Sequence, residues 1–261
     1  MNKTVIVTGG TSGIGKMLAD VYRKRGDKVF VFARDVEKNT EEEIKVDVCD
    51  EQNVKTAVDY VGKKCKTIDI VVNCAGYGLA GAVELTPLED AKRQFDTNFF
   101  GTFLVDKYAI PYMKKGSVIV NISSACALFA LPYRGFYCAS KSAVCLFSES
   151  LSIELAPSGI KVVSICPGDV KTNFCKNRIK VYETNERYGD NIQKSLQKVD
   201  GNQERRMLPE YVAKKIAKIS LKKNPKPMYI IGRKYKFLYF LSRVFPKKTM
   251  LYFTKRMFGR K

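Results

Sequence analysis

The sequence predicts one α/β domain with a doubly wound parallel sheet of about seven strands, flanked by helices. Short apolar, β-branched runs alternate along the chain with longer segments of helical periodicity, which is the order expected of repeated β-α-β units. The short runs are continuously apolar, as in strands buried on both faces of a parallel sheet. With 261 residues, of which 45% are hydrophobic, the chain can form one such domain with a sizeable core.

Seven segments are predicted strands and five are predicted helices. The strands are Thr4–Thr8, Lys28–Ala33, Ile44–Val46, Ile68–Asn73, Ser117–Ile122, Val162–Cys166 and Met228–Ile231. The helices are Lys16–Arg25, Asn53–Lys63, Pro87–Lys114, Phe136–Ala156 and Pro209–Leu221. The segment 173–207 is polar and shows no clear period, and it follows the last central strand, where open α/β sheets bind ligands. We expect this segment to cover the substrate. The alternative, which we favour less, is a disordered surface loop.

Histidine is absent from the chain. This absence excludes Ser-His-Asp and Cys-His catalysis and His-ligated metal or haem sites, so a general acid or base must be Asp, Glu, Lys, Tyr or Cys. The eight cysteines include no Cys-x-x-Cys pair, which favours reduced thiols in a cytoplasmic protein. We find no signal peptide, and no apolar run approaches the ~20 residues of a membrane span. We expect no metal site.

The net charge of +20 is concentrated in the C-terminal part of the chain. No acidic residue follows Glu210, whereas 16 Lys and Arg lie between Lys214 and Lys261, which leaves +4 for residues 1–210. A nearly neutral body argues against nucleic-acid binding, and we expect no nucleic-acid partner.

A glycine-rich turn, TGGTSGIG, ends the first predicted strand at Thr8–Gly15, and a helical pattern begins at once. Glycines permit a tight turn and let the backbone approach a pyrophosphate, while the N-terminus of the next helix presents free N–H groups to the phosphates. The turn therefore predicts a Rossmann-type dinucleotide site. Its expected contacts are Gly9, Thr11, Ser12, Gly13, Ile14 and Gly15.

The spacing of this turn resembles the fingerprint of the short-chain dehydrogenase/reductase family, and four further motifs of that family follow in order. They are Asn73-Cys74-Ala75-Gly76, Asn121-Ile122-Ser123-Ser124, Tyr137-Cys138-Ala139-Ser140-Lys141 and Pro167-Gly168. One departure is Cys74, where the family usually has a second Asn. The resemblance extends from Thr4 to about Thr172 and is closest to members that act on hydroxysteroids, retinol and ketosphinganine.

The resemblance implies a catalytic set of Asn98, Ser124, Tyr137 and Lys141. Tyr137 would exchange a proton with the substrate oxygen, to which Ser124 would donate a hydrogen bond. Tyr137 and Lys141 lie one helical turn apart on one face, so the ammonium is expected to lower the pKa of the phenol from ~10 toward the working range. Lys141 would also hold the nicotinamide ribose, and Asn98 would anchor a water relay to Lys141.

The end of the second predicted strand indicates which cofactor is bound. NAD-dependent members of the family usually carry an acidic residue at the position of Ala33, but here Arg34 follows, and a guanidinium suits a 2′-phosphate. We predict NADP(H) in preference to NAD(H); the alternative is a solvated Arg34 neutralised by Asp35. Further cofactor contacts implied by the resemblance are Asp47, Val48, Asn73, Ala75, Gly76, Tyr137, Lys141, Pro167, Gly168 and Thr172.

Residues 234–261 form a basic amphipathic extension. Apolar residues recur there at helical spacing on both sides of Pro246, with Lys and Arg on the other face. These apolar positions include Phe237, Phe240, Leu241, Val244, Met250 and Phe253. Three interpretations remain open: the apolar face packs on the body or a partner subunit, it contacts an anionic membrane surface, or it docks an acidic carrier or nucleic acid.

We predict an NADPH-dependent oxidoreductase that interconverts a carbonyl and a secondary alcohol on a lipophilic substrate of the steroid, retinoid or long-chain keto-lipid type. One alternative is a 3-oxoacyl-(carrier protein or CoA) reductase, which the extended C-terminus disfavours. Another is a non-catalytic NADP-binding sensor or scaffold, which the complete catalytic set disfavours. By the resemblance, we expect a homodimer or homotetramer in the cytoplasm, with membrane contact through residues 234–261 left open.

Overall fold

The centre of the molecule is a seven-stranded sheet in which every pairing is parallel. The computed structural model describes residues 2–175, 177–201 and 206–258. The strands of the sheet are β1 (Thr4–Thr8), β2 (Lys28–Ala33), β3 (Glu43–Lys45), β4 (Ile70–Asn73), β6 (Val118–Ile122), β7 (Lys161–Pro167) and β9 (Met228–Ile231), in the order β3-β2-β1-β4-β6-β7-β9. The predicted single-domain, Rossmann-type sheet is confirmed, and each strand begins and ends within two residues of its prediction.

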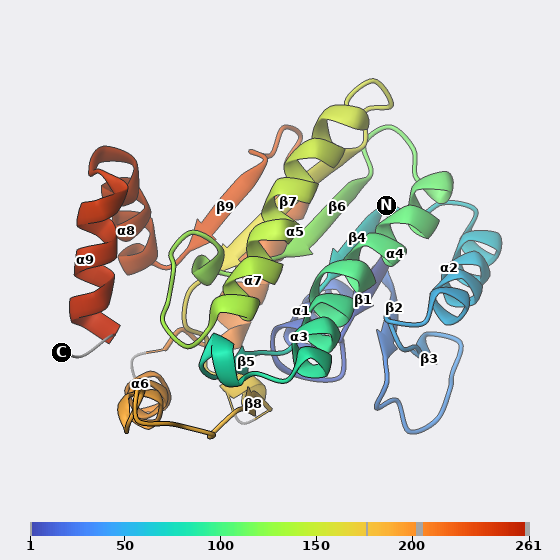
Figure 1. Ribbon diagram of the computed structural model, residues 1–261. Helices are drawn as coiled ribbons and strands as arrows, with labels where there is room; N and C mark the ends of the chain where they lie inside the picture. The colour runs from blue at the N-terminus through green and yellow to red at the C-terminus, as the bar shows by residue number, and fades with distance from the viewer. Residues whose placement is uncertain (1, 176, 202–205, 259–261) are drawn as a thin grey trace.

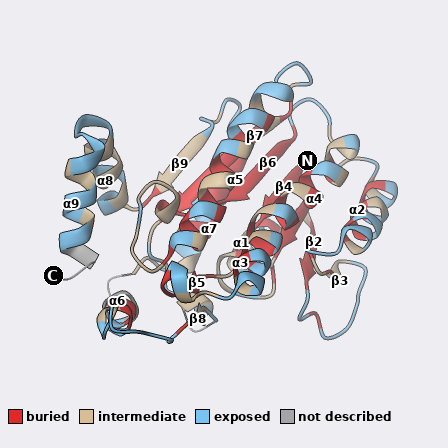
Figure 2. Cartoon of the chain, in the orientation of Figure 1, coloured by how far each residue is buried: buried red, intermediate tan, exposed pale blue. Residues whose placement is uncertain are grey.

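Helices cover both faces of this sheet (Figure 1). On one face, α1 (Gly13–Lys24) packs beside α7 (Pro209–Ser220). The other face carries α2 (Glu51–Cys65), α4 (Gly101–Ala109) and α5 (Gly135–Glu154). Figure 2 shows β1, β2, β4, β6 and β7 almost entirely buried between these two helical layers, whereas the edge strands β3 and β9 are mostly of intermediate exposure. Burial on both faces explains why the predicted strands are continuously apolar.

The predicted helix Pro87–Lys114 is interrupted in the structure. It consists of α3 (Leu88–Phe95), a π-helical turn (Asp96–Phe100), α4 and a 3₁₀ turn (Ile110–Tyr112). A π turn holds one more residue per turn than an α-helix, and such turns occur frequently at functional sites. Asn98 lies in this turn and is fully buried. A helical period in the sequence does not reveal such an interruption.

The segment predicted to cover the substrate contains more regular structure than its sequence indicates. β8 (Ile179–Lys180) pairs in parallel with β5 (Leu79–Ala80), and α6 (Asn191–Asp200) follows. Two buried residues of α6, Ile192 and Leu196, lie four positions apart and pack in a small separate cluster. This helical spacing is hidden by the polar residues around it. Figure 1 places α6 and β8 below the sheet, at the carboxyl ends of its strands.

The C-terminal extension forms a helical hairpin beside β9 (Figure 1). Its helices are α8 (Arg233–Val244) and α9 (Lys247–Phe258), which confirms two helical segments separated at Pro246. None of the described helices is both long and apolar enough to cross a bilayer. Residues 176 and 202–205 of the predicted substrate-covering segment, and 259–261 of the extension, lie outside the described residues.

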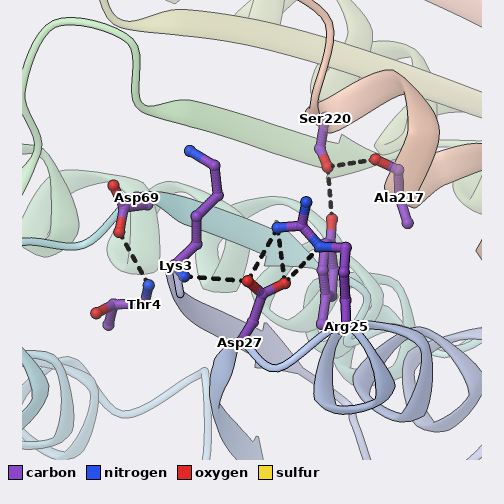
Figure 3. Close-up of polar contacts among 8 residues, drawn as sticks. Lys3, Thr4, Arg25, Asp27, Asp69, Ala217 and Ser220 are labelled. Carbon is purple, nitrogen blue, oxygen red and sulfur yellow. Dashed lines mark hydrogen bonds and ion pairs between the residues drawn. The ribbon is translucent and has the colours of Figure 1, made fainter. Parts of the chain in front are cut away.

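Polar contacts fasten the amino-terminal ends of the strands, opposite the cofactor turn (Figure 3). The buried Asp27 carboxylate forms an ion pair with Arg25 at 2.8 Å and accepts a hydrogen bond from the backbone N–H of Lys3 at 3.0 Å. The hydroxyl groups of Tyr22 and Ser220 are hydrogen-bonded at 2.7 Å and join α1 to α7. These contacts stabilise the fold at the amino-terminal ends of the strands. The ligand site lies at their carboxyl ends.

Candidate active site

The turn after β1 forms a narrow backbone cradle where the strand order of the sheet reverses. β1 lies between β2 and β4, and open α/β sheets bind ligands at such a switch point. Gly9 and Gly13 have φ values of 64° and 54°, which other residues rarely adopt. A Cβ atom on Gly15 would overlap the carbonyl oxygen of Gly9. Glycine at these positions therefore lets α1 begin directly against the turn.

The amino terminus of α1 faces the space above this cradle. Its first turn has no acidic residue, and its N-cap residue, Ser12, forms no side-chain capping hydrogen bond. The N–H groups and the positive end of the helix dipole can therefore bind phosphate. The Thr8 hydroxyl accepts hydrogen bonds from the backbone N–H groups of Cys74 and Ala75, both at 3.0 Å. These bonds hold the turn after β4 beside the cradle, and the arrangement fits a pyrophosphate.

A cavity of about 1070 Å³ opens at the carboxyl ends of the strands. This volume can hold a dinucleotide together with a substrate. The predicted site residues that line it are Gly9, Thr11, Ser12, Gly13, Ile14, Gly15, Arg34, Val48, Ala75, Gly76, Ser124, Tyr137, Lys141, Pro167, Gly168 and Thr172. Asp47, Asn73 and Asn98 are not among the described lining residues. Asp47 instead accepts a hydrogen bond from the backbone N–H of Cys49 at 2.9 Å.

Ser124, Tyr137 and Lys141 lie together in the wall of this cavity. Ser124 follows β6, and its hydroxyl accepts a hydrogen bond from the backbone N–H of Cys126 at 3.1 Å. Tyr137 and Lys141 share one face of α5. All three side chains belong to buried residues that are less than a tenth exposed. The Lys141 ammonium donates a hydrogen bond to the main-chain oxygen of Ile122 at 2.9 Å.

Burial governs the titration of both the phenol and the ammonium. It lowers the pKa of Lys141 to about 8. Burial also raises the pKa of Tyr137 above its ordinary value; Cys126 adds to this rise and a hydrogen bond with Ser124 opposes it. The expected lowering of the Tyr137 pKa by Lys141 is absent from this arrangement, because the ammonium is directed to a main-chain carbonyl. The phenol is therefore held in its protonated form, ready to donate.

Asn98 supports the cavity wall from behind. Its side-chain oxygen accepts a hydrogen bond from the Tyr77 N–H at 3.0 Å, and its nitrogen donates to the Tyr77 carbonyl at 3.1 Å and to the Ser140 hydroxyl at 3.2 Å. A Cβ atom on Gly76 would lie 2.8 Å from the Asn98 oxygen and 3.4 Å from the Lys141 ammonium. The glycine therefore allows Asn98 and Lys141 to approach each other behind this wall of the cavity.

Comparison with known proteins establishes the family. Residues 3–183 match the family described as short chain dehydrogenase. The chain belongs to this family. The 3-ketodihydrosphingosine reductase of Bacteroides thetaiotaomicron is 34% identical over 260 residues, with 97% of both chains covered. The solved structure of a short-chain dehydrogenase from Streptomyces avermitilis has a TM-score of 0.84 at 26% identity and covers 98% of this chain and 97% of its own.

A second solved structure, ElxO with NADP bound, is 28% identical with a TM-score of 0.74 and covers 91% of this chain and 100% of its own. This short-chain dehydrogenase is therefore an oxidoreductase, and its cofactor is a nicotinamide dinucleotide, NAD or NADP.

Beneath the dehydrogenase's cofactor turn, Asn73 belongs to a buried polar network. Its side-chain nitrogen donates hydrogen bonds to Asp106 at 2.7 Å and to Asn121 at 2.8 Å. Asn121 in turn donates to Asp106 at 2.9 Å and to Ser148 at 3.1 Å. Burial raises the pKa of Asp106 to about 7, although the hydrogen bonds from the two asparagines lower it. The network joins β4 and β6 to α4 and α5 and fixes the floor of the site.

We expect Asp106 to make the dehydrogenase less stable as the pH rises from 3.8 to about 7. The carboxyl has a pKa of 3.8 as a model group and about 7 when folded, so the folded state binds more protons within this window. The stabilisation is complete below pH 3.8 and is lost as the pH rises through the folded pKa. Asp106→Asn should lack this contribution. Urea unfolding of both proteins across the window measures it, and parallel pH profiles would contradict the raised pKa.

Phe174, Tyr235 and Asp169 are among the cavity residues that were not identified from the sequence. The ring of Phe174 lies 5.7 Å from the ring of Tyr137, centre to centre. Tyr235 of α8 packs against Gly168, where a Cβ atom would overlap its ring, and the Tyr235 hydroxyl donates a hydrogen bond to Asp169. Asp169 directly follows the Pro-Gly motif, which is the one signal that could have identified it. Nothing in the sequence pattern marks Phe174 or Tyr235.

The C-terminal hairpin of the dehydrogenase forms one wall of the cavity. Its lining residues are Lys234, Tyr235, Leu238, Met250, Phe253 and Thr254. The opposite face of α8 is exposed to solvent, where Phe237, Phe240 and Val244 are 61%, 61% and 60% exposed. Within one chain, these three side chains therefore remain largely accessible. The interpretations that concern this exposed face are packing on a partner subunit, contact with an anionic membrane surface, and docking of an acidic carrier or nucleic acid.

Proposed function

We propose that this short-chain dehydrogenase reduces a carbonyl of a lipophilic substrate to a secondary alcohol with NADPH. The observation that carries the proposal is the buried, protonated phenol of Tyr137 beside Ser124, in a cavity with apolar walls. These walls include Leu79, Phe129, Leu131, Phe174, Leu238 and Met250. Steroids, retinoids and long-chain keto lipids suit such walls, and the name of the Bacteroides relative favours a long-chain keto lipid.

In this mechanism Tyr137 donates its proton to the carbonyl oxygen as that oxygen gains negative charge. The Ser124 hydroxyl already accepts a hydrogen bond from a backbone N–H, so its own hydrogen can be donated to the same oxygen. Bound NADPH supplies the hydride. With the cofactor bound, Lys141 would hold the nicotinamide ribose, and Asn98 would order a water through which Lys141 regains its proton. Oxidation of the alcohol follows the same path in reverse.

We propose NADP(H) in preference to NAD(H) on the contacts around Arg34. Arg34 is exposed at the rim of the cavity, directly after β2. The carboxylate of Asp35 accepts a hydrogen bond from the Thr11 hydroxyl at 2.7 Å. No ion pair between Arg34 and Asp35 occurs among the described residues, so the guanidinium is not neutralised by its neighbour. It is therefore available for the 2′-phosphate of NADP.

Arg34→Ala should raise the Kd for NADPH about 10- to 100-fold and leave the Kd for NADH nearly unchanged, because the variant loses a charge-assisted hydrogen bond to phosphate. Fluorescence titration with both cofactors at fixed ionic strength measures this change. Lys55→Ala, which removes an exposed cation of α2 that lies 3.7 Å from Asp59, is the matched control. Equal affinities of the unchanged protein for NADPH and NADH would contradict the assignment.

We infer that residues 173–207 cover the bound substrate. Phe174 packs on the ring of Tyr137, and the segment continues through β8 and α6 at the carboxyl ends of the strands. Arg187 and Tyr188 of the same segment bond to Glu84 at 2.9 Å each. These bonds tie the segment to a residue outside it, and together with the Phe174 contact they support a cover that closes on the substrate and limits water access.

We also propose that the outer face of the hairpin contacts an anionic membrane surface. Exposed Phe237, Phe240 and Val244 lie on helices that carry eight Lys and Arg between 233 and 256 and no acidic residue. Apolar and cationic side chains together fit the boundary of an anionic bilayer. Phe253 both lines the cavity and is 49% exposed. A lipophilic substrate could therefore pass from the bilayer to the cavity along the hairpin.

The protein should sediment with phosphatidylglycerol vesicles and bind phosphatidylcholine vesicles far less, because each Lys or Arg near an anionic surface contributes about 1 kcal/mol. Phe237→Ser combined with Phe240→Ser should weaken vesicle binding, as should added salt. Leu88→Ser, at the start of α3, where Leu88 is 61% exposed, is the control for loss of an exposed apolar side chain. Failure of the unchanged protein to bind anionic vesicles at low salt would contradict membrane contact.

We propose a cytoplasmic homodimer or homotetramer that associates through α4 and α5. Leu146 and Ile153 of α5 are 69% and 75% exposed, and Phe100, just before α4, is 49% exposed. Exposed apolar residues on adjacent helices support an interface between copies of the chain. All eight cysteines are free thiols, which supports a reducing compartment.

A further inference from the structure

Arg134 is a nearly fully buried cation that the surrounding protein does not neutralise. It precedes α5, lines the cavity and is 9% exposed. Within residues 2–175, 177–201 and 206–258, no hydrogen bond or ion pair of its guanidinium is found. Among the described residues, the fully buried polar side-chain atoms without a partner belong to Asn73, Tyr77 and Gln94, so the guanidinium nitrogens of Arg134 keep access to the cavity. A largely buried cation without a protein partner is unfavourable. Its retention in a cavity wall therefore points to a ligand that supplies the missing negative charge.

The backbone before Arg134 is held in an unusual conformation. Tyr133 has a φ of 60°, in the left-handed region that residues other than glycine rarely adopt. The Tyr133 carbonyl accepts a hydrogen bond from the Gly81 N–H at 3.0 Å, and its ring meets that of Tyr188 edge to face at 6.3 Å. Strained residues fixed by their surroundings cluster at functional sites. Here the strain sets the direction in which the chain enters α5, just before Arg134.

Arg134 lies close to the proposed catalytic phenol. It is the N-cap residue of α5, three positions before Tyr137 in the chain, and its carbonyl accepts a hydrogen bond from the Cys138 N–H at 2.9 Å. Both side chains line the same cavity. A group bound by Arg134 would therefore lie next to the carbonyl that Tyr137 protonates.

Two other charged residues of the cavity already have partners. Arg93 forms an ion pair with Asp90. Asp169, a carboxylate in the same cavity, accepts a hydrogen bond from the Tyr235 hydroxyl. Arg134 differs from both because its charge is unmatched within the described part of the chain.

We propose that Arg134 binds a carboxylate of the substrate, adjacent to the reducible carbonyl, so that the substrate is an oxo acid with an apolar chain. The inference rests on the proposed function and narrows its substrate class. One planar guanidinium matches the geometry and the single charge of a carboxylate. The apolar walls would hold the chain. A substrate with an ammonium beside its carbonyl would be repelled by Arg134, unless Asp169 bound it instead.

Three probes of equal chain length test the proposal with NADPH: a medium-chain 3-oxo acid, its methyl ester and a 2-amino ketone. We expect the unchanged protein to reduce the acid with a kcat/KM about 100-fold above that of the ester, the ratio expected for a buried charge pair. Arg134→Met should remove this preference, mainly through KM for the acid, and leave the ester nearly unaffected. Its Tm should not fall, because Met replaces a buried charge without a partner.

Four results would each contradict a different part of the proposal. Equal reduction of acid and ester by the unchanged protein would overturn the role of Arg134 and leave the proposed reductase intact. Preference for the amino ketone would assign recognition to Asp169 and also overturn it. A fall in the Tm of Arg134→Met with an unchanged acid-to-ester ratio would show that Arg134 is structural. Reduction of none of the probes, nor of any neutral lipophilic ketone, would overturn the proposed function itself.

Discussion

Tyr137→Phe should lower the rate of carbonyl reduction about 10²–10⁴-fold, the contribution typical of a positioned general acid. The substitution removes only the hydroxyl, so the ring can keep its contact with Phe174. The transition state would then lose its proton donor and retain only the hydrogen bond from Ser124. The Kd for NADPH should stay nearly constant, because the glycine turn and Arg34 are unchanged. Steady-state NADPH consumption and fluorescence titration measure the two quantities.

Tyr112→Phe is the matched control for Tyr137→Phe. Its hydroxyl donates to Asp59 at 3.0 Å, away from the cavity, so its removal should leave the rate unchanged. Full activity of Tyr137→Phe would contradict the mechanism. Absence of turnover in the unchanged protein, together with tight NADPH binding, would instead favour a non-catalytic sensor.

Lys141→Met should lower activity at least about 100-fold without lowering stability at neutral pH. The buried ammonium has a pKa of about 8, against 10.5 as a model group, which corresponds to about 3 kcal/mol of unfavourable burial. Loss of the bond to the Ile122 carbonyl costs about 1–3 kcal/mol and offsets this gain. The free energy of unfolding should therefore stay equal or rise slightly while catalysis is lost.

The pH profile separates Lys141 from a purely structural lysine. Between pH 8 and 10.5 the unfolded state binds more protons than the folded state, so the unchanged protein should gain stability as the pH rises through this range. Lys141→Met should lack that gain, and Lys55→Met should keep it. Urea unfolding at several pH values measures the effect. A marked loss of stability at neutral pH in Lys141→Met would contradict the assigned burial cost.

Most of the fold was predictable because its determinants are local in sequence. Apolar runs marked the strands of the main sheet, although β3 has a single apolar residue, Ile44, between two charged ones. TGGTSGIG marked the turn between β1 and α1 through conformations that only glycine readily adopts. The interruption before α4 was not predictable, because a π turn preserves the apolar pattern on either side. α6 was missed because its buried apolar residues Ile192 and Leu196 lie among polar neighbours in the sequence.

The residues of the candidate site were predictable where they belong to sequence motifs and line the cavity. The positions of their side chains were less predictable where contacts with other elements of the fold determine them. Asn73 matches its motif, yet its side chain lies in the network of Asp106, because a buried carboxyl provides its partner. The direction of the Lys141 ammonium depends on a main-chain carbonyl of another element. The hairpin wall and the unmatched charge of Arg134 arise from segments that meet only in the folded chain.

NADPH-dependent carbonyl reduction is tested most directly with the purified protein and medium- and long-chain ketones and oxo acids. NADPH consumption is measured, and the product is identified by mass spectrometry. We expect one molecule of NADPH to be oxidised for each molecule of secondary alcohol formed. We expect the Tyr137→Phe variant to form almost no alcohol. Tight NADPH binding with no alcohol from any ketone or oxo acid would contradict the assignment of a carbonyl reductase.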